Sequence, residues 1–398
     1  MSSRIPRSLL SLAIGGFGIG LTEFVIMGPL PDVAKAMNVS IAQAGHYIAA
    51  YALGVVVGAP LLVIAGRNLP PKKMLLVLMV IFTVFNGLSA LAPNGTSLLI
   101  LRFLSGLPHG AYFGVGAVVA GRIAGPGKAA SAFAVMLSGL TICNIIGVPI
   151  ATYIGQMVSW RASFALVAVV GIATLIAIAM TIPNFESENK GGSVRQDFVI
   201  FKNPSLWYAI VIASIGFGGF FAWFSYITPL LTNVTGVSKE YVPYFLSLAG
   251  VGMTVGNWMG GRMADSMSAI KAVVYLLIAM ISVLLLDSLL AAHLIPMIFL
   301  TFATGAIAMA MGAPIQIILI NSSKESPLLG SSIGQGAFNL GNSLGAFLGG
   351  LPLAAGMTFT SPLWVGAGLA FTGLIVAFKL FRKGAHIDLP VSKDQLMH

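Results

Sequence analysis

Residues 8–30 read SLLSLAIGGFGIGLTEFVIMGPL, an apolar run of 23 residues in which Glu23 is the one charged side chain. A helix needs about 20 apolar residues to cross the hydrocarbon core of a bilayer, so this run is long enough to cross it once. Similar runs continue along the chain, each separated from the next by a short polar stretch. Together they lie near 8–30, 43–65, 74–92, 97–121, 129–154, 161–183, 206–230, 242–261, 271–291, 296–320, 328–353 and 361–381. The pattern predicts an all-α membrane protein with twelve transmembrane helices.

The composition of the whole chain agrees with this prediction. Of the 398 residues, 57% are hydrophobic and 8% are charged, whereas soluble domains carry about 25% charged residues. The mean hydropathy of +0.96 shows that the apolar excess extends over the full length. The single cysteine, Cys143, excludes an intrachain disulfide. Twelve crossings with their connections take up nearly all of the 398 residues. The chain therefore has no spare length for a soluble catalytic domain.

The distribution of basic residues predicts how the chain crosses the membrane. With the N-terminus inside, 17 of the 21 Lys and Arg residues fall on the cytoplasmic side, and Lys35, Arg161 and Lys239 fall outside. Arg102 lies within the membrane. Cytoplasmic loops of membrane proteins carry such an excess of basic residues. We therefore expect both termini in the cytoplasm, and we do not interpret the net charge of +10 as a sign of nucleic-acid binding.

An internal repeat indicates two related halves. The longest polar interval, about 184–205, predicts a first bundle at 1–183, a cytoplasmic linker at 184–205, and a second bundle with a short tail at 206–398. A shift of 198 residues aligns identical residues in three separate helix pairs. The aligned pairs are Gly18 with Gly216, Gly20 with Gly218, Pro31 with Pro229, Gly54 with Gly252, Gly58 with Gly256, Asn144 with Asn342 and Gly147 with Gly345. Two repeated halves with a site at the midplane are a common plan among transporters.

Several motifs resemble those of the major facilitator superfamily, over nearly the whole chain. They are LTEFVIMGPLPDVA at 21–34, RFLSGLPHG at 102–110, the glycines from Gly139 to Gly147 followed by Val148 and Pro149, and WRASF at 160–164. The third is similar to the family's antiporter signature, although Ala151 replaces a usual glycine. Within this superfamily, the motifs most resemble those of the arabinose-efflux-permease-like exporters, in the drug:proton antiporter branch. The resemblance implies two pseudo-symmetric six-helix bundles, alternating access and proton-driven export.

The loop after the second helix departs from the family pattern. The family has an acidic gating residue there, whereas this chain reads GRNLPPKK at 66–73, with Arg67 in the acidic position. The repeat partner at 261–265 reads GRMAD and keeps the acid. We therefore expect Arg262 and Asp265 to supply the cytoplasmic charge lock from the second half.

Glu23 is the most informative residue in the chain. A charged acid at the centre of a membrane helix costs about 2.5–3.5 kcal/mol on insertion scales, and such residues are usually partnered, hydrated or protonated. A carboxyl group there could take up and release a proton, as a proton-coupled transporter requires. The alternative is a structural acid that is permanently protonated or salt-bridged. We favour the first interpretation, because ionisable groups within membranes usually mark a transport pathway.

Arg102 and His109 are the other candidates for proton coupling. They are seven residues apart and share one face of the fourth helix. Arg102 could hold Glu23 ionised until the substrate or a movement separates them, and His109 could titrate near physiological pH. Alternatively, Arg102 snorkels to the lipid headgroups, and His109 bonds a neighbouring carbonyl. It is the resemblance, not the sequence pattern, that places the first and fourth helices around one cavity.

The candidate substrate site consists of aromatic and amide side chains. By the 198-residue shift, Phe221 takes the position of Glu23, so we expect it to face the cavity. The amides could bind a polar substrate or could join helices by hydrogen bonds of about 0.6 kcal/mol each. The full set is Tyr51, Asn144, Phe221, Gln316, Gln335, Asn339 and Asn342.

The remaining candidates concern gating and the membrane interface. Small residues allow helices to approach each other closely. We expect Gly58 to allow such an approach. We expect the same of Gly139, Gly147 and Pro149 where the fifth helix meets the other half. With Arg67, Arg262 and Asp265, these residues form the predicted gate. We expect Asp287 and Asp32 to lie at the membrane interface.

These observations predict a proton-coupled antiporter that exports a small organic solute, such as a sugar or an amphipathic drug, across the inner membrane. The histidines have no metal-ligand spacing, and the GPGKAA stretch at 125–130 fails the phosphate-loop pattern, so we expect neither a metal nor another cofactor. The expected partners are a small-molecule substrate, protons and membrane lipid, with the protein a monomer. An importer or uniporter of the same fold stays open, as does, less favoured, a membrane-embedded lipid-modifying enzyme.

Overall fold

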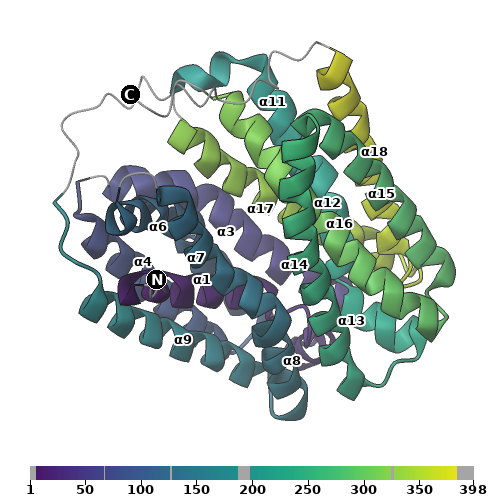
Figure 1. Ribbon diagram of the computed structural model, residues 1–398. Helices are drawn as coiled ribbons and strands as arrows, with labels where there is room; N and C mark the ends of the chain where they lie inside the picture. The colour runs from purple at the N-terminus through teal and green to yellow at the C-terminus, as the bar shows by residue number, and fades with distance from the viewer. Residues whose placement is uncertain (1–5, 67, 126–127, 187–197, 324–326, 383–398) are drawn as a thin grey trace, which may run out of the picture.

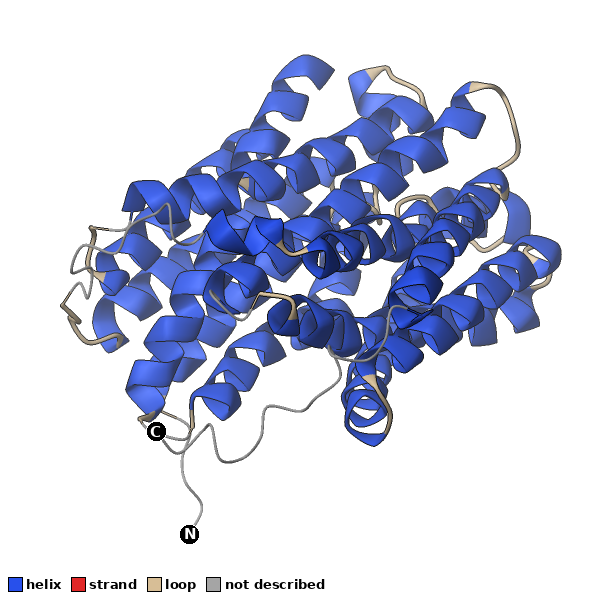
Figure 2. Ribbon diagram, turned by 90° about the horizontal axis from the view of Figure 1, so that it is seen from above, coloured by secondary structure: helices blue, strands red, loops and turns tan. Residues whose placement is uncertain are grey.

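The computed structural model describes residues 6–66, 68–125, 128–186, 198–323 and 327–382. Regular structure in this part of the chain is helical throughout, without strands (Figures 1 and 2). The first half contains α1 (Arg7–Phe24), α2 (Leu30–Met37), α3 (Ile41–Gly66), α4 (Pro71–Ala90), α5 (Gly95–Gly106), α6 (Pro108–Ala124), α7 (Ala129–Ile142), the π-helix η1 (Cys143–Gly147), α8 (Val148–Met157) and α9 (Trp160–Thr181).

The second half repeats this plan. It contains η2 (Phe198–Lys202), α11 (Pro204–Val211), the π-helix η3 (Ile212–Gly216), α12 (Phe217–Phe224), α13 (Ile227–Leu230), the π-helix η4 (Leu231–Thr235), η5 (Lys239–Tyr241), α14 (Val242–Ser266), α15 (Ala269–Leu290), α16 (Leu294–Asn321), α17 (Pro327–Ala354) and α18 (Ser361–Arg382). In Figure 1 the first half lies to the left and the second half to the right.

The twelve-helix prediction is confirmed once broken helices are read as single rods. The pieces α5 with α6, α7 with η1 and α8, and α11 to η4 each follow one apolar run of the sequence. Among the described residues, nine helical segments, three of them made of joined pieces, are long and apolar enough to cross a bilayer. The first run is not one helix, however, because α1 ends at Phe24 and α2 begins at Leu30. Pro29 explains the break, since it has no N–H with which to continue a helix from Val25.

The internal repeat is visible in how the helices pack. A Cβ atom added to Gly54 would meet the carbonyl of Phe103, and one added to Gly252 would meet that of Phe302. Likewise, α3 approaches Leu107 at Gly58, and α14 approaches Ala306 at Gly256. The same close approach therefore joins α3 to α5 in the first half and α14 to α16 in the second. Gly58 acts within the first half, in keeping with its predicted packing role.

The two halves meet toward one end of the bundle, which we call the far end. It lies opposite the terminal end, where α1 begins, α9 ends, α11 begins and α18 ends. At the far end Lys239 Nζ lies 2.8 Å from Asp32 Oδ1, and the Thr228 hydroxyl donates to the Met27 carbonyl over 3.0 Å. Asp32 is partly buried, with a side chain 27% exposed. The described conformation is thus closed at the far end.

The break in the fifth rod adds to this closure. In η1 the Val148 N–H bonds the Cys143 carbonyl, one residue further back than in an α-helix, so it does not bond the Asn144 carbonyl as an α-helix would. Pro149 has no N–H for the Ile145 carbonyl. Both carbonyls face α14 of the other half, where Gly250 packs against the first and the Ser247 hydroxyl donates to the second over 3.1 Å.

The structure corrects the expected position of two glycines. Gly139 packs against the backbone of Ala13, and Gly147 against the ring of Phe17, so both serve the contact of the fifth rod with α1 in the same half. The contact with the other half comes from the carbonyls that the π-helix and Pro149 release. Sequence spacing alone does not show which face of a helix points to which neighbour.

We expect Gly256→Ala to lower the thermal unfolding midpoint of the purified protein in detergent. The added Cβ would overlap the Ala306 backbone, and overpacking of this kind costs about 1–3 kcal/mol. Gly312→Ala is the matched control in the same half, because no atom lies within 4 Å of its Cβ position. Equal midpoints for the two variants would contradict the packing described here.

Candidate functional site

Glu23 lies in the last turn of α1, where the two halves meet. Its side chain is 6% exposed. Asn342 of α17 donates a hydrogen bond from Nδ2 to Glu23 Oε1 over 3.3 Å. In the part of the chain that the structure describes, no basic group forms an ion pair with this carboxyl. The partner of Glu23 is therefore an uncharged amide from the other half of the molecule.

Arg102 is fully buried, which removes the alternative in which it snorkels to the headgroups. Its Nη1 donates to the Thr22 hydroxyl over 3.1 Å, and its Nη2 donates to the Thr22 carbonyl over 3.0 Å. The Thr22 hydroxyl in turn donates to Asn86 Oδ1 over 2.5 Å, and Asn86 Nδ2 donates to the Phe82 carbonyl over 2.9 Å. This chain of hydrogen bonds joins α5, α1 and α4. It holds the Arg102 guanidinium against Thr22, the residue that precedes Glu23.

His109 bonds a side chain and not the neighbouring carbonyl considered above. Its Nδ1 lies 3.0 Å from the hydroxyl of Tyr51 on α3. The Arg102 guanidinium carbon lies 4.4 Å from the centre of the Tyr51 ring, a distance at which a cation is attracted to an aromatic face. These contacts join the side chains into one cluster. We call it the polar cluster, and its members are Glu23, Arg102, Tyr51, His109, Thr22, Asn86 and Asn342.

Phe221 lies beside this cluster but is enclosed by other rings. It is 3% exposed, and its ring stacks on Phe24 with centroids 6.5 Å apart and planes 11° from parallel. Phe217 and Phe220 pack on it edge to face. In this conformation the rings close the junction of α1 and α12 at the level of Glu23.

The other predicted amides do not all join the polar cluster. On α17, Asn339 Nδ2 donates to the Gln335 carbonyl over 3.1 Å, and Gln335, Asn339 and Asn342 form a line that runs from the terminal end to Glu23. A Cβ added to Gly334 would lie 2.8 Å from Gln316 Oε1, which places Gln316 beside the start of this line. Asn144 contributes a backbone carbonyl to the contact with α14.

Two residues of the polar cluster were not among the predicted site residues, namely Thr22 and Asn86. Both are fully buried. A polar side chain next to Glu23 and an amide within the apolar run at 74–92 were available signals. The sequence does not show, however, that these two side chains would meet Arg102.

The predicted cytoplasmic charge lock stays a prediction. Arg67 lies outside the described residues, as does the side chain of Asp265. The Arg262 guanidinium stacks on the ring of Trp258, 3.6 Å from its centre. That stacking shows one contact of Arg262 and does not test a lock.

Asp287, near the end of α15, is fully buried among neighbouring helices. Its place at the membrane interface stays a prediction. Asp287 accepts a hydrogen bond from the Thr304 hydroxyl at Oδ2 over 2.9 Å, which joins α15 to α16. Burial between two helices of the same half explains why an acid near a helix end is not at the surface. Among the described residues, no group of three or more His, Cys, Asp or Glu side chains could hold a metal ion.

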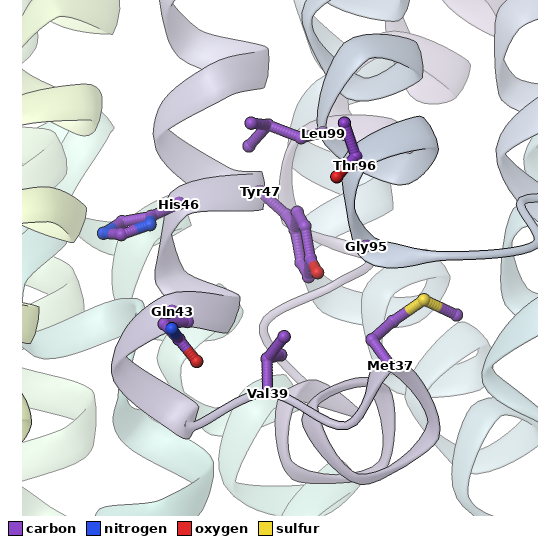
Figure 3. Close-up of a pocket in the computed structure, with 8 residues that line it drawn as sticks. All are labelled: Met37, Val39, Gln43, His46, Tyr47, Gly95, Thr96 and Leu99. Atoms are coloured by element: carbon purple, nitrogen blue, oxygen red, sulfur yellow. The ribbon is translucent and has the colours of Figure 1, made fainter.

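A small cavity of about 290 Å³ lies at the far end of the first half (Figure 3). The ends of α2, α3 and α5 surround it, and its lining residues are Met37, Val39, Gln43, His46, Tyr47, Gly95, Thr96 and Leu99. Gln43 Oε1 accepts a hydrogen bond from the Ser40 N–H over 2.9 Å, so this polar group is occupied in starting α3. The cavity is separate from the polar cluster.

Comparison with known proteins gives consistent matches over nearly the whole chain. A profile of the Major Facilitator Superfamily matches residues 12–334. The chain is 37% identical over 390 residues to the putative transporter AraJ of Escherichia coli (strain K12), covering 97% of this chain and 98% of that protein. It is 38% identical over 385 residues to the inner membrane transport protein YdhP of the same organism, covering 96% and 97%.

A more distant relative and a solved structure extend the comparison. The chloramphenicol resistance protein of Streptomyces lividans is 27% identical over 382 residues, covering 94% of this chain and 96% of that protein. The crystal structure of a D-xylose-proton symporter superposes with a TM-score of 0.74 at 14% identity, covering 97% of this chain and 98% of that one. At that identity the likeness shows the fold alone.

We expect Thr22→Val to destabilise the protein and Thr22→Ser to leave it near wild type. Valine removes the hydroxyl that accepts from Arg102 and donates to Asn86, and a buried group left without its partner costs about 1–3 kcal/mol. Serine keeps that hydroxyl. Thermal unfolding in detergent measures both variants, and a Val variant as stable as the Ser variant would show that the hydrogen-bond chain is dispensable.

Proposed function

This chain belongs to the Major Facilitator Superfamily, and on that premise we propose that it exports a small organic solute in exchange for protons. The family and the fold make it a transporter and not an enzyme, which removes the lipid-modifying alternative. The observation that carries the proposal is Glu23, a carboxyl group buried where the two halves meet, with a guanidinium held at the adjacent residue.

The proposed cycle uses the polar cluster as the proton site. We place the terminal end in the cytoplasm, as the distribution of basic residues predicts, so the described conformation is closed to the outside. In the outward-facing conformation Glu23 takes up a proton. The halves then rock to the inward-facing conformation, and the proton is released as the substrate binds. Arg102 biases this exchange through its charge, and His109 through its hydrogen bond with Tyr51.

The proposed substrate path follows the line of amides on α17. Gln335 and Asn339 lead from the terminal end toward Glu23, and the side chain of Asn339 is buried with Oδ1 lacking a partner among the described residues. No atom lies within 4 Å of the Cβ position of Gly336, between these two residues. Amides beside phenyl rings such as Phe221 suit a sugar or an amphipathic drug. One relative is named for chloramphenicol resistance, which supports the second class.

The proposal includes the location of the protein. One relative, YdhP, is named as an inner membrane transport protein, and we place this chain in the same membrane with both termini in the cytoplasm. We propose that the two bundles divide at 184–205, that the protein acts as a monomer in lipid, and that Arg262 and Asp265 contribute to gating.

Transport in reconstituted vesicles tests the coupling. The probes are radiolabelled chloramphenicol and a panel of pentoses and disaccharides, with the vesicle lumen made acidic. Antiport predicts that protons leaving the lumen drive the labelled solute inward. A symporter would accumulate solute under the opposite gradient, and a uniporter would be insensitive to both. These outcomes separate the exporter from the importer or uniporter of the same fold.

We expect Glu23→Gln to abolish gradient-driven accumulation and to retain exchange of labelled for unlabelled solute. Glutamine preserves the shape and the hydrogen bond with Asn342 but cannot carry a proton. Glu240→Gln is the control, since Glu240 is an exposed acid at the far end of the second half, away from the polar cluster. Wild-type accumulation in Glu23→Gln would remove Glu23 from the mechanism.

A further inference from the structure

Two buried polar atoms beside Glu23 have no hydrogen-bond partner among the described residues. They are Oδ1 of Asn342 and Nε of Arg102, and both side chains are fully buried. Buried polar groups in native proteins are nearly always paired, so each exception calls for an explanation. One of these atoms belongs to the second half and the other to the first. The Glu23 carboxyl bonds the Asn342 side chain, and the Arg102 guanidinium is close enough to interact with it electrostatically.

The amide of Asn342 matches a neutral carboxylic acid better than a carboxylate. Its Nδ2 already donates to Glu23 Oε1 over 3.3 Å. A protonated carboxyl group also has an O–H to donate, whereas a carboxylate is an acceptor only. The neutral acid can therefore pair with both Nδ2 and Oδ1 of the amide. The carboxylate leaves Oδ1 without a partner and adjacent to a negative charge.

The unpartnered Nε of Arg102 offers the ionised carboxyl group a different partner. Hydrogen bonds between charged groups are stronger than those between neutral ones. Arg102 lies on α5 of the first half, the same half as Glu23, whereas Asn342 lies on α17 of the second. A partner exchange from Asn342 to Arg102 would remove a hydrogen bond between the halves and replace it with one inside the first half.

We propose that Asn342 links the protonation of Glu23 to closure of the far end, as a positioning residue that pairs with the neutral acid across the two halves and releases the carboxylate. This inference rests on the proposed role of Glu23 as the proton carrier. It assigns Asn342 to conformational coupling instead of to the substrate site where sequence reasoning had placed it. Protonation then favours the far-end-closed conformation, and loss of the proton favours its opening.

Among the described residues, the other titratable groups around Glu23 belong to the first half. Arg102 and Tyr51 lie in the polar cluster, His109 is bonded to Tyr51, and Cys143 of η1 packs beside α1 at Gly20. From the second half, α17 presents Asn342 and α12 presents the phenyl rings around Phe221, none of which titrates. The pairing between the halves at this depth therefore depends on the proton of Glu23.

A distance measurement between spin labels at the far end tests the inference. Leu91, at the end of α4, and Met357, between α17 and α18, are 74% and 60% exposed and can be replaced by labelled cysteines in a Cys143→Ala background. Electron–electron distance distributions in lipid nanodiscs between pH 6 and pH 9 give the ratio of far-end-closed to far-end-open molecules. No substrate is needed.

We expect this ratio in the otherwise unmodified labelled protein to fall about five- to tenfold as the pH rises, the change that loss of one ordinary hydrogen bond produces. Glu23→Gln should stay closed at every pH, because glutamine can pair with both atoms of the amide. Asn342→Leu should show a low ratio at pH 6 and little further fall. Asn339→Leu is the control: Asn339 is a buried amide three residues earlier on the same helix, bonded to Gln335 and not to Glu23, and should respond to pH as the unmodified protein does.

The outcomes separate the two proposals. A normal pH response in Asn342→Leu together with none in Glu23→Gln would overturn the role of Asn342 and leave Glu23 as the proton carrier. A normal pH response in Glu23→Gln would overturn both. If Asn342→Leu lowers the ratio of closed to open molecules by the same factor at every pH, the pH dependence is unchanged. That result would show a merely structural contact and would also overturn the inference.

Discussion

A guanidinium and a carboxyl group placed in the apolar interior must find hydrogen bonds there, and the centre of this molecule is arranged to provide them. Arg102 donates to the backbone and side chain of Thr22, which sits beside Glu23 in the chain. The Thr22 hydroxyl in turn donates a hydrogen bond to Asn86 on a third helix. Charged groups buried in membranes are tolerated when they are paired or face the interior of a bundle. The packing of α1, α4 and α5 therefore depends on these polar contacts as well as on apolar burial.

Glu23 differs from Arg102 because its hydrogen bond crosses between the halves. Each half of a transporter of this family moves largely as a unit, so contacts inside one half persist while contacts between halves form and break. The Arg102 hydrogen bonds belong to the first class and the Glu23–Asn342 hydrogen bond to the second. A proton on Glu23 can therefore influence the conformation only through groups such as Asn342.

Breaks in the helices supply the other contacts between the halves. Backbone groups within a membrane must be satisfied internally, yet a π-helix and a proline interrupt the α-helical pairing of two carbonyls of the fifth rod. From the other half, Gly250 of α14 packs closely against the first carbonyl, and the Ser247 hydroxyl donates to the second. The predicted closeness of the fifth helix to the other half thus holds, but through Asn144 and Ile145 and not through Gly139 and Gly147. Glycine marks a close approach and does not name the partner.

The sequence by itself determined the number of apolar runs, the repeat of 198 residues and the presence of Glu23, Arg102 and His109 within the membrane, because hydropathy, glycine spacing and isolated charges are properties of one segment at a time. Only the tertiary structure decided that Arg102 bonds Thr22, that His109 bonds Tyr51, that Asp287 is buried and that Asn342 reaches Glu23. Those pairs join residues on different helices, 319 positions apart in the last case, and their meeting depends on helix rotation and crossing, which no single segment encodes.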